Sequence, residues 1–172
     1  RHARGAGRHV DTTRQTGQQL MSYDLRDHTA DVAIEATAPT LSALFEAVAD
    51  GLAAASCESI PETGDRFGVS VTAESREALL FDFLDQLIYE RDVRLVLPAD
   101  HRCDVSLVTG DGETGDDSRN ETGGESAWTV EATARAVPLA AVAAREIKAV
   151  TYSQMTVERR GIEWYAYVVL DV

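Results

Sequence analysis

Lysine is nearly absent from this chain of 172 residues, which contains one lysine, Lys148, beside 15 arginines and 29 acidic residues. The formal net charge is −13 at pH 7. Such a charge repels itself at low salt and is screened at high salt, where the Debye length falls to about 3 Å at 1 M. The composition therefore favours a protein from a salt-accumulating halophile over a merely acidic mesophilic protein. Because lysine is not used here as a general solubilising residue, we expect a specific role for Lys148.

The chain also lacks an excess of positive charge and any long apolar run. Direct, non-specific binding of nucleic acid depends on cationic residues that neutralise phosphates, so the acidic balance argues against it. Any link to RNA would have to run through a protein partner. No apolar run reaches 18 residues, so no membrane span is expected, and no secretory leader is recognised. These absences predict a cytoplasmic protein.

Cysteine and the common catalytic motifs are equally scarce. Cys57 and Cys103 lie far apart and form no CxxC pair, so reduced, partly buried thiols are expected, although a disulfide stays open. The sequence has no HExxH zinc motif, no GxxxxGK[ST] phosphate loop and no GxSxG nucleophile motif. These absences weigh against a hydrolase or nuclease with its own carboxylate-bound cation.

Composition divides the chain into three parts. Residues 1–21 are polar with almost nothing to bury, and they predict a disordered N-terminal extension that ends at Met21, a candidate native start. Residues 22–172 predict one domain with one core. Within it, residues 110–125 contain no apolar residue and predict a mobile hairpin loop. The carboxylates of this loop lack the D-x-D-x-D-G…E spacing, so no calcium site is expected there.

Apolar spacing predicts two long helices. Thr40 is a plausible N-cap for the first helix and Ser75 for the second. Both helices carry apolar residues at intervals of three and four, which is one apolar stripe on each helix. The stripe of the first is Leu41, Leu44, Phe45, Val48 and Leu52, and that of the second is Leu79, Leu80, Phe83, Leu84, Leu87 and Ile88.

Alternating apolar and polar residues predict the strands. They fall at residues 23–26, 31–37, 67–73, 93–97, 102–109, 127–137, 147–157 and 162–172. Pro98 is expected to stop the short fourth strand, and Ile162 to open the apolar face of the last. The strands are grouped rather than strictly alternating with helices. This order predicts an α+β fold in which two long helices pack on one face of a mainly antiparallel sheet.

Two carboxylates fall at predicted strand ends, Asp31 at the start of an early strand and Asp171 beside the final residue. With the main-chain or terminal carboxylate oxygens of Val172 they would suit a hard cation such as Ca²⁺ or Mg²⁺, which takes oxygen ligands. Spacing alone does not place these ends together, so two unrelated surface carboxylates remain the competing interpretation. His28 could be a ligand, an acid–base group or a capping side chain.

Two further charged features stand out. Asp82 and Asp85 lie three residues apart and share one helical face, for which a solvated or partner-facing role is favoured over acid–base work. Lys148 lies in a predicted strand. Because a buried ammonium group loses its hydration, Lys148 should have a carboxylate nearby or reach solvent.

Four short motifs occur in order along the chain: HTADV at 28–32, LLFDFLDQLIY at 79–89, EIKAVTY at 146–152 and LDV at 170–172. In this order they resemble the motifs of the archease family, and the similarity covers residues 22–172 apart from 110–125. The second motif departs from the family at Asp85 and Gln86, where Asn and Glu are usual.

The resemblance implies both a function and a site. Archeases are small cytosolic proteins that assist the tRNA-splicing ligase RtcB, promote its guanylylation and multiple turnover, and are not themselves ligases. For this chain the resemblance implies a divalent metal site, with Ca²⁺ as the expected ion, formed by Asp31, Asp171 and Val172. It also implies a functional role for Lys148 and, more loosely, for His28. A chaperone or adaptor for RNA-modifying enzymes is the alternative.

Overall fold

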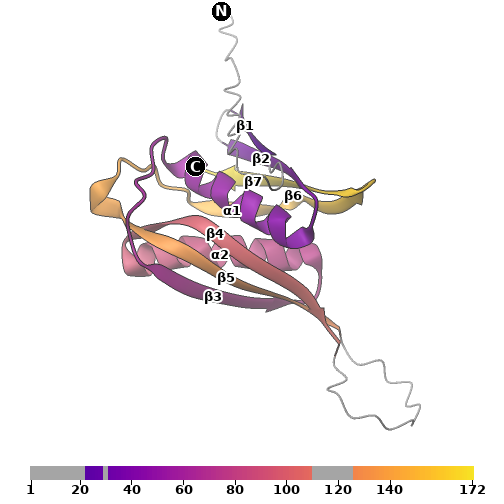
Figure 1. Ribbon diagram of the computed structural model, residues 1–172. Helices are drawn as coiled ribbons and strands as arrows, with labels where there is room; N and C mark the ends of the chain where they lie inside the picture. Colours follow the sequence, from indigo (N-terminus) through magenta and orange to yellow (C-terminus); the bar gives the residue numbers. More distant parts are fainter. Residues whose placement is uncertain (1–21, 29–30, 110–125) are drawn as a thin grey trace, which may run out of the picture.

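The computed structural model describes residues 22–28, 31–109 and 126–172, and the first of these segments for its backbone alone. The predicted extension at 1–21 and the predicted loop at 110–125 lie outside these residues. The described chain forms two helices, seven strands and one short 3₁₀ turn (Figure 1). In chain order they are β1 (Ser22–His28), β2 (Asp31–Ala38), α1 (Leu41–Ser56), β3 (Arg66–Ala73), α2 (Arg76–Arg94), β4 (Val96–Val108), β5 (Ala127–Pro138), η1 (Leu139–Ala141), β6 (Ala149–Arg160) and β7 (Glu163–Asp171).

The strands form two sheets rather than the single sheet predicted from the sequence. The four-stranded sheet has the order β1-β2-β7-β6 and the three-stranded sheet the order β3-β5-β4. All the strand pairs in both sheets are antiparallel. Helix α1 contacts β2 and β4, and α2 contacts β3 and β6, so each helix packs against both sheets (Figure 1). The predicted α+β class, with two helices and antiparallel strands, is confirmed.

Burial of α1 explains why two sheets are needed. Of its 16 residues 12 are buried, including many alanines outside the predicted stripe. A helix that is apolar on most of its circumference must be covered on more than one side. Gly51 allows β2 to come close, because a Cβ added at Gly51 would lie 3.0 Å from the Cγ2 atom of Ile34. Helix α2 buries only five residues and keeps one side polar.

Both helices begin as predicted. The Oγ1 atom of Thr40 accepts a hydrogen bond from the backbone N–H of Ala43 at 3.1 Å, and the Oγ atom of Ser75 accepts one from Ala78 at 3.1 Å. Each cap of this kind stabilises a helix by roughly 1 kcal/mol. The helices then meet in the core through Phe45 and Phe83, whose ring centroids are 6.0 Å apart. Neither helix of the described chain is long and apolar enough to cross a membrane.

The region around Pro98 corrects the sequence prediction. Helix α2 continues to Arg94 and ends at Leu95, which has the left-handed φ of 55°. The next strand is not a short one that stops at Pro98, because β4 runs through that residue to Val108. Proline lacks a backbone N–H and is tolerated here because β4 is an edge strand. A register shift between Ala99 and Arg102 then divides β4 into two halves.

Side chains of α1 cover the open edge of β4. Three acceptors one helical turn apart meet the backbone N–H groups of alternate strand residues. The pairs are Ser42 Oγ with Val105 N at 2.9 Å, Glu46 Oε1 with Cys103 N at 2.8 Å, and Asp50 Oδ1 with His101 N at 3.0 Å. Four helical residues rise about 6 Å, close to the span of two strand residues, so the two spacings match. Edge N–H groups that would attract another strand are thereby satisfied.

The predicted C-terminal hairpin is present, with two differences. Strand β6 begins at Ala149 rather than at residue 147, and β7 begins at Glu163. Ile162 was expected on the apolar face of the last strand, but it lies in the hairpin turn and is 86% exposed. The adjacent Gly161 has a positive φ of 64°, which the tight turn requires and which glycine adopts without strain.

Candidate functional site

The residues selected from the sequence meet in one row across the four-stranded sheet. His28 of β1 pairs with Asp31 of β2, Asp31 pairs with Asp171 of β7, and Asp171 pairs with Ala149 of β6. Lys148 directly precedes Ala149, and Val172 directly follows Asp171. The strand register therefore brings together five positions that span almost 150 residues of sequence.

The two carboxylates lie on the same face of this sheet. Side chains of directly paired residues point to the same side, and successive residues alternate between sides. The next pair, Val32 and Leu170, belongs to the core that packs on the helices. Asp31 and Asp171 therefore point to the opposite, outer face, where both are half-buried. Within the described residues neither carboxylate forms an ion pair, so two like charges face each other without a countercharge.

This arrangement fits a hard cation. Adjacent carboxylates repel, and a cation with oxygen ligands would relieve the repulsion. The carbonyl oxygen of Asp171 already accepts a hydrogen bond from Lys148 N at 2.8 Å. The carboxylate of Asp171 and the oxygens of Val172 therefore remain as ligands for a cation. Among residues 31–109 and 126–172 no group of three or more His, Cys, Asp or Glu side chains is placed to hold a metal. Main-chain oxygens and water would have to complete the ligand set.

Lys148 is exposed and its backbone is fixed on both sides. The backbone N–H of Lys148 itself donates to Asp171 O, which ties this residue to the end of β7. Three residues earlier, Arg145 donates from its backbone N to Ser56 O at 2.8 Å and from Nε to Ala55 O at 2.8 Å. Ile147 between them is buried. The sequence-based expectation that this ammonium group reaches solvent is confirmed.

Arg145 is a residue that sequence reasoning missed. Helix α1 has no basic residue in its last turn, so its terminal carbonyl groups receive no cation from the helix itself. Arg145 supplies that positive charge from a distant part of the chain, where it also favours the negative end of the helix dipole. The lack of a basic residue at the end of the first predicted helix was the only signal of this requirement in the sequence.

A second missed feature is an aromatic pair between α2 and β6, in which Phe81 is partly buried and Tyr152 is exposed. Phe81 and Tyr152 pack edge to face with ring centroids 5.4 Å apart, and Tyr152 is 53% exposed. Strand β6 is irregular at this point, because its register with β7 changes between Thr151 and Thr156. Tyr152 and Lys148 lie four residues apart and both are exposed, with the buried Val150 between them. On α2 the acidic pair predicted to face solvent or a partner, Asp82 and Asp85, is exposed, as is Tyr89 at 57%.

His28, Thr29 and Ala30 complete the first motif, but only part of it can be placed. His28 is the last residue of β1 and the backbone partner of Asp31. Its side chain and the next two residues lie outside the described part of the chain. A role for the His28 side chain stays a prediction.

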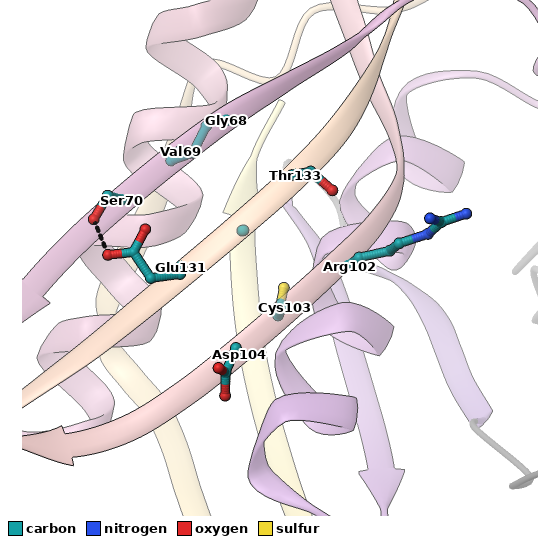
Figure 2. Close-up of a pocket in the computed structure, with 9 residues that line it drawn as sticks. Gly68, Val69, Ser70, Arg102, Cys103, Asp104, Glu131 and Thr133 are labelled. Atoms are coloured by element: carbon teal, nitrogen blue, oxygen red, sulfur yellow. Dashed lines mark hydrogen bonds between the residues drawn. The ribbon is translucent and has the colours of Figure 1, made fainter.

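The outer face of the three-stranded sheet carries a different groove of about 590 Å³ (Figure 2). Short polar side chains and both signs of charge line it, with Ser70, Arg102, Asp104 and Glu131 among them. The hydroxyl of Ser70 donates to Glu131 Oε1 at 2.7 Å (Figure 2). Ser70 and Glu131 are directly paired across β3 and β5, so this contact is a cross-strand side-chain pair on the surface of the sheet.

The environment of Cys103 does not favour a reactive thiolate. Both Cys57 and Cys103 are free, as the sequence predicted. Burial raises the pKa of the Cys103 thiol, and the nearby carboxylates of Glu46 and Asp50 raise it further. The thiol therefore stays protonated at neutral pH, whereas the thiolate is the reactive form.

Known proteins are similar to this chain in sequence and in fold. The model of the archease protein family (MTH1598/TM1083) matches residues 23–172. The archease of Methanosarcina acetivorans is 30% identical over 159 residues, which are 90% of this chain and 98% of that protein. The archease of Pyrococcus furiosus is 30% identical over 164 residues, which cover 89% of this chain and 100% of that protein.

Two solved structures are also similar. Protein 1598 of Methanobacterium thermoautotrophicum matches with a TM-score of 0.66 and 24% identity, over 87% of this chain and 98% of its own. An archease of Thermotoga maritima, described as a possible chaperone, matches with a TM-score of 0.53 and 21% identity, over 86% and 94%. Fold and site define a small α+β protein whose candidate site is built from strand ends. The chain belongs to the archease family.

Proposed function

We propose that this protein activates an RtcB-type RNA ligase in the cytoplasm, and that it promotes guanylylation and multiple turnover of that ligase in tRNA splicing. The observation that carries the proposal is the row of His28, Asp31 and Asp171, with Lys148 beside it. All four motifs of the sequence analysis contribute to this row or to the neighbouring face of α2. The net charge of −13 favours contact with the ligase over contact with RNA.

Each group in the row has a role that its geometry supports. Asp31, Asp171 and the oxygens of Val172 would hold a divalent cation, for which Ca²⁺ is the best candidate. When bound, that ion supplies a fixed positive charge at an otherwise acidic strand end. Lys148 presents a flexible ammonium group from a fixed backbone, suited to a phosphate or carboxylate of the partner. The protein thus acts on the ligase and performs no bond-making step.

Ligase guanylylation tests this proposal directly. The cognate ligase would be incubated with GTP and divalent metal in high salt, with and without substoichiometric amounts of this protein. We expect faster formation of the ligase–GMP adduct with the protein present. An unchanged rate, with folded protein and a ligase shown to be active, would contradict the proposal.

A chaperone or adaptor for RNA-modifying enzymes is the second candidate. The exposed ring of Tyr152, which packs on the partly buried Phe81, favours it, because an exposed aromatic ring suits protein contacts without any metal. The description of the Thermotoga maritima archease as a possible chaperone points the same way. Activity that survives complete chelation, and that extends to several unrelated client enzymes, would favour this candidate over the ligase activator.

A further inference from the structure

A small, partly enclosed cavity lies between α1, α2, β4 and the segment that precedes β6. Its volume is about 20 Å³. Its walls are mostly apolar, but three polar side chains also reach it, those of Ser56, Arg91 and His101. Two nitrogen atoms among them, Arg91 Nε and His101 Nε2, are buried from solvent and have no hydrogen-bond partner in the described residues. Buried polar atoms in folded proteins are nearly always paired, so two such atoms in one cavity require an explanation.

The hydrogen-bonding roles of these groups follow from their other contacts. His101 is only 3% exposed, and its Nδ1 atom lies 2.8 Å from Asp50 Oδ1. A carboxylate oxygen accepts, so Nδ1 carries the proton and Nε2 of the neutral ring is an acceptor. The Nε–H group of Arg91 can only donate. The hydroxyl of Ser56 donates to Leu52 O at 3.0 Å, which leaves its oxygen free to accept.

We propose that this cavity binds one water molecule. The water would accept a hydrogen bond from Arg91 Nε and donate to His101 Nε2 and Ser56 Oγ. One donor and two acceptors in the wall match the two protons and the lone pairs of water. Buried waters typically make about three hydrogen bonds, and a cavity needs roughly 10–15 Å³ of probe-occupied volume to hold one. An anion does not match this wall, because two of the three groups would turn lone pairs toward it.

The bound water would join three elements beneath the candidate site. Ser56 ends α1, Arg91 lies in the last turns of α2, and His101 lies in β4. Ile147 forms part of the cavity wall, and the carbonyl of Ser56 accepts the backbone N–H of Arg145. The water site therefore lies directly under the segment that holds Lys148. The inference stands whether or not this protein activates a ligase.

A crystal structure of the full chain, with a parallel crystal soaked in bromide, tests the identity of the occupant. We expect a single peak within hydrogen-bond distance of Arg91 Nε, His101 Nε2 and Ser56 Oγ, with no anomalous signal from bromide. Bromide in the cavity would overturn the proposal in favour of an anion site, and an empty cavity would overturn it outright. Imidazole ¹⁵N shifts should show the proton of His101 on Nδ1, and a proton on Nε2 of the neutral ring would contradict the assignment.

A variant pair provides the test in solution. Arg91→Met removes the donor but keeps an apolar stem, and Arg94→Met is the matched control, because Arg94 pairs with Glu90 at the surface. Magnetic relaxation dispersion of water oxygen-17 counts long-lived buried waters. We expect Arg91→Met to hold one fewer than the unmodified protein and Arg94→Met to hold the same number. An equal count in Arg91→Met would refute the role of Arg91 in binding the water.

Discussion

Each of the two sheets carries a pair of directly opposed carboxylates on its outer face. In the four-stranded sheet one such pair is Asp31 and Asp171, and in the three-stranded sheet Asp104 faces Glu131. The pairs differ in their surroundings. Glu131 accepts a hydrogen bond from Ser70, and Arg102 lines the same groove, whereas Asp31 and Asp171 lie at strand ends beside Lys148. Paired acids alone therefore do not mark a site in this acidic chain.

The edge strands of the two sheets also differ in what covers them. The edge strand β4 of the three-stranded sheet is covered by acceptor side chains of α1. The edge strand β6 of the four-stranded sheet instead carries the exposed Tyr152, and the exposed Lys148 directly precedes this strand. The edge strand of one sheet thus has backbone N–H groups covered by a helix, whereas the edge of the other leaves side chains exposed to solvent. This contrast supplies matched controls for every test of the candidate site.

The largest effect is expected on ligase activation. Asp31→Ala and Lys148→Ala should each lower activation of guanylylation by about 10–100-fold, the range for residues that support metal sites. Asp104→Ala removes an equivalent carboxylate from the other sheet and should leave activation unchanged. The rate of ligase–GMP formation at fixed protein concentration is the measurement. Full activation by both site variants would show that the working surface lies elsewhere.

Calcium binding should distinguish the two carboxylate pairs by stability. A ligand at 100 times its Kd stabilises the folded state by about 2.7 kcal/mol. For a domain of this size, each kcal/mol of added stability raises the Tm by about 2–4 °C. Ca²⁺ should raise the Tm of the unmodified protein and of Asp104→Asn, and not that of Asp31→Asn. A Tm increase that persists in Asp31→Asn and disappears in Asp104→Asn would show that the ion binds at the three-stranded sheet instead.

The same contrast shows what could be predicted from sequence. Thr40 and Ser75 were found because a helix cap depends on a few neighbouring residues. The division into two sheets was not found, because alternation assigns the faces of a strand but not its partners. The pairing of Asp31 with Asp171 likewise depends on register across the whole chain. Only the resemblance to a family brought those two residues together before the structure did.

Loss of the cover on β4 should reduce stability without affecting the candidate site. Asp50→Ala removes the acceptor for both the backbone N and the Nδ1 atom of His101. A buried donor without a partner costs about 1–3 kcal/mol, so we expect a decrease of that size in the free energy of unfolding. Asp82→Ala on the exposed face of α2 should change it by less than about 0.5 kcal/mol. Equal effects in urea denaturation would contradict the role assigned to Asp50.

The smallest expected effect is a change in how stability depends on pH at Glu46. Burial raises the pKa of this carboxyl group, and Asp50 adds to the shift, while the hydrogen bond from Cys103 N and the positive charge of Arg102 oppose it. The folded protein therefore holds the proton more tightly than the unfolded chain does. The resulting stabilisation is fully present below the ordinary value of 4.5 and is lost as the pH rises through the folded pKa.

Glu46→Gln tests this dependence, because an amide oxygen can still accept from Cys103 N but does not titrate. We expect the unmodified protein to lose stability relative to Glu46→Gln between pH 4 and pH 7, as measured by urea denaturation at each pH. Ser42→Ala removes a neighbouring acceptor without a titrating group, so its effect should be the same at both pH values. A parallel pH dependence for Glu46→Gln and the unmodified protein would show that the titration of Glu46 does not contribute to the pH dependence of stability.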